Sequence, residues 1–105
     1  MSVYSSRSHD SAHKQYVYLA EGLGPDVRLM KIGHSWNIKV RIGQLRRSMR
    51  LSEVRILGKK KYGFDEVVKI EKRLHEALRE IAINPRSEWY WFNEQVIATW
   101  RSVCR

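Results

Sequence analysis

The chain is poor in the residues that hold proteins together by cross-links or anchor them in membranes. It has 105 residues but a single cysteine, Cys104, which excludes an internal disulfide and a zinc site built on cysteines. A lone cysteine favours a reducing, cytoplasmic setting. No apolar run approaches the about 20 residues that a membrane-spanning helix needs, so we expect no membrane segment. The first ten residues have no apolar core, and we expect no secretory signal there.

Acidic residues are almost missing from the middle of the chain. Residues 28–61 carry 11 basic side chains and one acid, Glu53, a net charge of +10, whereas the whole chain has a net charge of +9. A basic surface that served solubility alone would be spread evenly along the sequence. Such a concentrated charge instead favours a polyanionic partner, most simply a nucleic acid. An anionic membrane surface would call for a long basic amphipathic helix, which the sequence lacks.

The hydrophobic pattern predicts one α+β domain over residues 15–105, preceded by a serine-containing tail or arm over residues 1–14. The predicted order is β-β-α-β-α-(short β)-α. Strands are expected at 15–21, 27–33, 53–61 and 88–92. Helices are expected from Ser35 or Asn37 to about Met49, from a cap at Asp65 to about Ala82, and from Asn93 or Glu94 to Val103.

Two charged residues fall on the apolar faces of their predicted helices. Glu71 lies within about 60° of Val67 and Leu74 on a helical projection. Arg41 lies between Ile38 and Leu45 at the edge of its apolar stripe. A carboxylate that faces a core is costly unless it is paired, hydrogen-bonded or bound to a metal. A structural ion pair between Arg41 and Glu71 therefore explains the pattern as well as a functional site does.

Five short motifs occur in an order that resembles the GIY-YIG nuclease superfamily, in its compact branch. The resemblance covers about residues 15–92 and implies a three-stranded antiparallel sheet flanked by helices. It also implies metal-dependent hydrolysis of phosphodiester bonds in DNA. The motifs are Tyr16-Val17-Tyr18, Lys31-Ile32-Gly33, Arg41, the Glu71–His75 helix and Glu88-Trp89-Tyr90.

The sequence departs from the family pattern at three places. Tyr16 and Val17 stand where the name-giving glycine and isoleucine would be, and Lys31 replaces the second tyrosine. The compact branch often carries lysine there, so the replacement does not indicate inactivation. For the family's asparagine near the end of the domain, we take Asn93 as the candidate.

The resemblance implies a role for each matched residue. Glu71 would bind one divalent ion, Mg²⁺ or Mn²⁺, because no other acid of its helix faces the core. Tyr18 would handle the attacking water, and Lys31 would favour its phenolate. Arg41 would hold the scissile phosphate, and His34 would assist proton transfer. We expect these groups to line one concave site.

Other residues have both a functional and a structural explanation. His75 could assist proton transfer or be structural, Tyr16 suits plain sheet packing, and Glu88 could brace the last helix. A solvated surface is the alternative for six basic residues that could follow a DNA backbone, namely Arg46, Arg47, Arg50, Lys59, Lys60 and Lys61.

The leading function is thus a metal-dependent DNA endonuclease, and the alternative is a non-catalytic nucleic-acid-binding module with the same basic surface. One active site cuts one strand at a time. Cleavage of both strands would therefore require a homodimer or two encounters.

Overall fold

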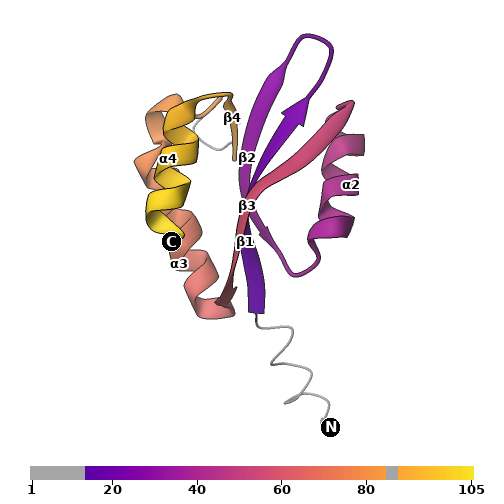
Figure 1. Ribbon diagram of the computed structural model, residues 1–105. Helices are drawn as coiled ribbons and strands as arrows, with labels where there is room; N and C mark the ends of the chain where they lie inside the picture. The colour runs from indigo at the N-terminus through magenta and orange to yellow at the C-terminus, as the bar shows by residue number, and fades with distance from the viewer. Residues whose placement is uncertain (1–13, 85–87) are drawn as a thin grey trace, which may run out of the picture.

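A computed structural model describes residues 14–84 and 88–105 of the chain. It shows an α+β fold in which one four-stranded antiparallel sheet lies between helices (Figure 1). The strands, in the spatial order β3-β1-β2-β4, are β1 (Lys14–Leu23), β2 (Arg28–Ser35), β3 (Glu53–Gly63) and β4 (Trp89–Trp91). The helices are α2 (Ile38–Ser48), α3 (Phe64–Ala77), the 3₁₀ turn η1 (Arg79–Ile81) and α4 (Glu94–Val103).

Both faces of the sheet are covered. Helices α3 and α4 lie on one face and α2 lies on the other (Figure 1). Strand side chains alternate between the two faces of a sheet. Val17 and Leu19 of β1 therefore pack with residues of α3 and α4. Tyr18 and Ala20 pack on the other face, with residues of α2. This explains why the centre of β1 reads as a continuous apolar run rather than an alternating one.

The predicted order of elements is confirmed, and the largest differences in boundaries concern α3. Asn37 caps α2 by accepting a hydrogen bond from the Val40 amide at 3.1 Å, and Asn93 caps α4 in the same way through Gln95. The predicted cap at Asp65 is wrong, because β3 leads directly into α3 through the extended residue Gly63. The same helix ends at Ala77 rather than near Ala82, and η1 follows it.

The short aromatic strand joins the sheet and makes it four-stranded rather than three-stranded. Its residues pair antiparallel with Leu29 to Lys31 of β2. Beyond that point β2 continues to Ser35, and within the described residues no strand pairs with it on that side. The last part of β2 is therefore a free edge, and the candidate site lies around it.

One buried carboxylate escaped the sequence analysis. Glu21 in β1 is 2% exposed, and its two oxygens pair with Arg28 and Arg55 from the neighbouring strands β2 and β3. This cluster lies towards the β1–β2 hairpin and ties three strands together, so its role is structural.

Among residues 14–84 and 88–105, none of the helices has the length and apolar character of a membrane span. The expected tail, residues 1–14, lies outside the described residues except for Lys14, which begins β1.

Candidate active site

The Tyr18 hydroxyl lies over a glycine at the free edge of β2. Tyr18 is fully buried and pairs across the strands with Gly33, and a Cβ atom added at Gly33 would come within 2.6 Å of the hydroxyl oxygen. Burial raises the pKa of Tyr18; Arg41 opposes this shift, and the negative charges of Glu88 and Glu71 add to it. Tyr18 is therefore a neutral phenol at neutral pH. Burial dominates this shift, and the cation that opposes it is Arg41 rather than Lys31, the residue that the resemblance implied.

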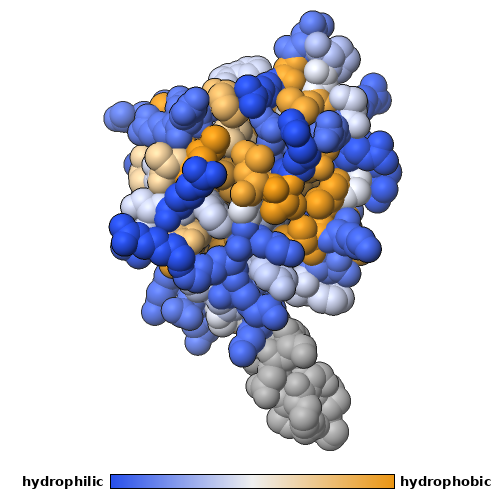
Figure 2. Space-filling model, viewed as in Figure 1, coloured by the Kyte–Doolittle hydropathy of each residue, from blue (hydrophilic) through white to orange (hydrophobic). Residues whose placement is uncertain are grey.

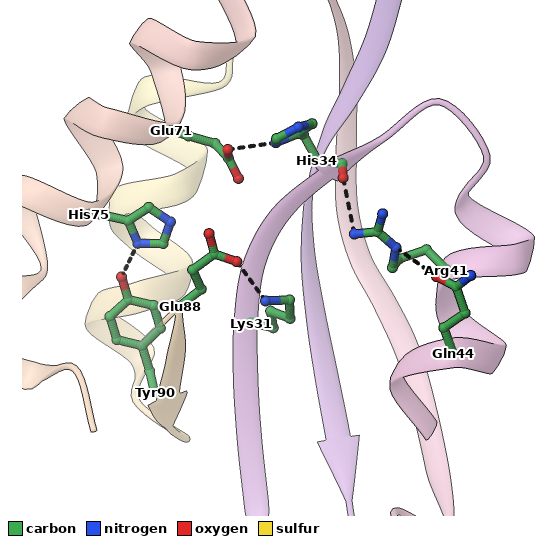
Figure 3. Close-up of polar contacts among 8 residues, drawn as sticks. All are labelled: Lys31, His34, Arg41, Gln44, Glu71, His75, Glu88 and Tyr90. Atoms are coloured by element: carbon green, nitrogen blue, oxygen red, sulfur yellow. Dashed lines mark hydrogen bonds and ion pairs between the residues drawn. The ribbon is translucent and has the colours of Figure 1, made fainter. Parts of the chain in front are cut away.

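Glu71 and Arg41 both approach His34, from different elements (Figure 3). Glu71 extends from α3, and its Oε1 lies 2.6 Å from Nδ1 of the His34 ring. Arg41 extends from α2 and donates through Nη1 to the His34 backbone oxygen at 3.3 Å, while its Nε donates to Gln44 at 3.1 Å. Arg41 and Glu71 are thus not paired with each other, and the direct ion pair considered from the sequence is not formed.

Glu88 joins the site through Lys31. The Lys31 ammonium donates to Glu88 Oε1 at 2.7 Å and lies 5.4 Å from the centre of the Trp89 ring. Partial burial by itself would raise the pKa of Glu88, but the hydrogen bond and charge of Lys31, with His75 and His34, more than offset it and lower the pKa. Glu88 is therefore ionised at neutral pH. Glu88 thus pairs with Lys31 of β2, rather than bracing the last helix.

Glu71, His75 and Glu88 form a group with the chemistry of a metal site. One potential ligand atom from each lies within 4.8 Å of the other two. His75 Nδ1 is hydrogen-bonded to the Tyr90 hydroxyl at 2.6 Å, which leaves Nε2 as the ring atom for a ligand. Burial lowers the pKa of His75, with a smaller contribution in the same direction from Lys31, although Glu88 and Glu71 oppose the shift. The neutral ring that this favours is the form that binds metals.

The predicted site residues do not share one concave face. Tyr18 and Arg41 belong to the α2 side of the sheet, whereas His34 and Glu71 meet on the α3 side. Opposite faces would normally be separated by a continuous sheet. Here the Tyr18 hydroxyl reaches the Cβ position of Gly33, which has no side chain, and the charges of Glu71 and Glu88 still act on it. Lys31 links β2 to Glu88 (Figure 3).

The six basic residues proposed for DNA binding are all exposed, but they are not on one surface. Lys59 and Lys61 pair with Tyr18 and Tyr16 in the register of β1 and β3, and both ammonium groups lie over the Tyr16 ring, at 5.0 and 5.4 Å. They therefore lie on the α2 side. Lys60 faces the other side, as alternation requires, with its ammonium 5.8 Å from the Tyr62 ring. The remaining three are Arg46 and Arg47 in α2 and Arg50 in the turn after it.

Two residues near the site, Tyr90 and Trp36, were not assigned a role from the sequence. Tyr90 orients His75 by its hydroxyl, and Trp36, at the junction of β2 and α2, is exposed beside Arg41. Asn93, the candidate for the family's asparagine, caps α4. No periodicity singles out Tyr90, because a strand of three residues is too short to show a pattern.

Replacing Gly33 with alanine is expected to lower the free energy of unfolding by about 1–3 kcal/mol, the usual cost of overpacking a core. The new methyl group would collide with the hydroxyl of Tyr18, whose ring is enclosed and has no room to move. Urea denaturation measures this loss. Gly63→Ala is the matched control, since its nearest neighbouring atom is 4.0 Å away.

Tyr18→Phe in the Gly33→Ala background should restore part of the stability, because it removes the nearest atom. A Gly33→Ala protein as stable as the Gly63→Ala control would contradict the packing described here.

A protein-family model, the T5orf172 domain, matches residues 15–105, which is most of the chain. The comparisons with curated proteins and with solved structures gave no match. The sheet flanked by helices is compatible with a GIY-YIG-like fold. The chain belongs to the T5orf172 domain family, a GIY-YIG-like, phage-associated family of the nuclease type.

Proposed function

We propose that this protein is a metal-dependent DNA endonuclease of the GIY-YIG type, acting on DNA in the cytoplasm. One observation carries the proposal. Among the described residues, four buried side-chain polar atoms have no hydrogen-bond partner, and three of them belong to Tyr18, Glu71 and His75. Buried polar atoms are rarely left unpaired, and such an atom calls for a bound ion, a water molecule or a catalytic role. The fourth, in Trp100, lies elsewhere in the core, where its ring packs on Gly58.

The residues present fit a single divalent cation. Glu71 Oε2 and His75 Nε2 are both buried without a partner, and Glu88 provides a second carboxylate beside them. Carboxylates suit Mg²⁺ and Mn²⁺, and an imidazole ligand favours the transition metal of the two. Such an ion would neutralise charge on the phosphate and activate a water molecule. Tyr90 and Lys31 would orient His75 and Glu88 as ligands.

The other side chains supply the remaining parts of a hydrolytic site. Arg41 would bind the scissile phosphate, for which a guanidinium fork is well suited. Tyr18, as a neutral phenol, would donate its hydroxyl proton in a hydrogen bond and so position the attacking water. His34, held by Glu71 at 2.6 Å, would accept the proton of that water. A homodimer would bring two such sites to the two strands.

Nicking of supercoiled plasmid DNA is the direct test of this proposal. We expect relaxed plasmid to appear with Mg²⁺ or Mn²⁺, faster with Mn²⁺, and not with EDTA. Gel-shift binding to the same DNA in EDTA is measured in parallel. Binding without nicking under any metal would support the alternative function, a non-catalytic DNA-binding module, which the exposed basic residues also favour.

A further inference from the structure

The junction between β2 and α2 exposes a large aromatic side chain beside the predicted phosphate-binding residue. Trp36 is 69% exposed, the highest value among the large hydrophobic residues exposed in the described ranges. Val40, one helical turn further on, is 53% exposed. Both residues line one hollow, and apolar side chains exposed next to each other, unlike single ones, are typical of a surface that receives a partner.

Trp36 and Arg41 line the same hollow, which has a volume of about 330 Å³. This is at the lower end of the range of small-ligand sites, about 300–1,000 Å³. Its lining includes apolar side chains and side chains that can form hydrogen bonds. The lining residues are Ser35, Trp36, Asn37, Val40, Arg41 and Gln44.

The backbone that carries Trp36 is fixed on both sides. The Ser35 hydroxyl accepts from the Asn37 amide and donates to the Asn37 backbone oxygen, both at 3.0 Å, and Asn37 in turn caps α2. Arg41 is held against His34 and Gln44. The backbone of Trp36 and the guanidinium of Arg41 are therefore held in place, which reduces the entropy lost when a ligand binds both residues.

We propose that Trp36 is a stacking platform for an unpaired nucleobase next to the phosphate bound by Arg41. This inference rests on the proposed function and specifies its substrate as DNA with an unpaired nucleotide at the cleavage site. A base inside a duplex is stacked on both faces, whereas an unpaired base can place one face on an aromatic ring. Every base has such a face, so the platform recognises unpaired structure rather than sequence.

The charge around the hollow favours a nucleic acid over a protein segment as the occupant. Residues 28–61 include the hollow and carry a net charge of +10. Lys39 and Arg47 are exposed on the same helix as Val40 and Arg41. A phosphodiester chain that entered the hollow would thus meet a helix that carries basic and no acidic residues.

Binding in EDTA tests this inference without depending on cleavage. The probes are a labelled short duplex with one unpaired central nucleotide and the same duplex fully paired. We expect Trp36→Ala to weaken binding of the first about tenfold and to leave the second unchanged, with Trp36→Phe close to wild type. Trp91→Ala is the matched control, because Trp91 is 57% exposed and lies in β4, away from the hollow.

Equal weakening of both duplexes by Trp36→Ala, or no weakening at all, would overturn the platform. So would a change in the self-association of Trp36→Ala without a change in DNA binding, since the ring would then serve a protein contact. A different result would show that the proposed nuclease function is wrong while the stacking platform is right. The wild type would then discriminate the two duplexes through Trp36 but would nick no DNA in Mg²⁺ or Mn²⁺.

Discussion

Glu71→Gln is expected to reduce metal-dependent nicking by at least about a hundredfold, since even the loss of a residue that only supports a metal ligand costs 10–100-fold. Glutamine keeps the shape of the side chain and can still hydrogen-bond to His34, but it lacks the charge that a hard cation requires. DNA binding in EDTA should be equal or stronger, because a negative charge is removed near the phosphates. Plasmid nicking and a gel shift measure the two effects.

Thermal melting of the same variant separates the catalytic role from a structural one. The matched control is Glu76→Gln, which changes the same charge at an exposed position of the same helix, α3. We expect both variants to melt close to the wild type. Breaking a structural buried pair would instead destabilise the protein by about 3–5 kcal/mol. Such a loss together with retained nicking would show that Glu71 is a structural carboxylate.

The triple variant Arg46→Ala, Arg47→Ala, Arg50→Ala is expected to weaken DNA binding for all sequences alike. Each phosphate contact contributes about 0.9 to the slope of log affinity against log salt, so the loss of three contacts should flatten the slope by about 2–3. The three side chains are exposed, and their removal should hardly change the melting temperature. Fluorescence anisotropy at several salt concentrations measures the slope.

A second triple variant with the same change in charge provides the control. Arg79, Arg101 and Arg105 are also exposed, and they lie in η1, in α4 and after α4. Their replacement by alanine should alter the slope much less, because they are not on the α2 side of the sheet. Equal slopes for the two triple variants would show that net charge, rather than the α2 surface, determines binding.

The local elements and the unusual positions of two charged residues could be predicted from the sequence. The strand and helix order depends on hydrophobic period and on short-range signals such as the caps Asn37 and Asn93, which the chain carries locally. Glu71 could be singled out because a carboxylate is unusual within the apolar stripe of a helix. In the structure its side chain is only 12% exposed.

Contacts between elements could not be predicted in this way. Tyr90 and Glu88 reach the site only because β4 pairs with β2, and nothing in their own segment indicates that His75 and Lys31 will be opposite them. Figure 2 shows a related effect on the surface, where hydrophobic side chains remain visible among hydrophilic ones despite the helices that cover both faces. Which side chains stay exposed depends on how completely each face is covered.

The sequence by itself predicted the fold class, contains the basic middle segment and named candidate site residues, because composition, periodicity and motif order are properties of the chain. Only the tertiary structure decided how the groups combine. It paired Glu71 with His34 rather than with Arg41, and it buried Tyr18 deeply enough to raise its pKa. The packing of α3 and α2 against opposite faces of the sheet sets these relations, because it brings together segments far apart in the sequence.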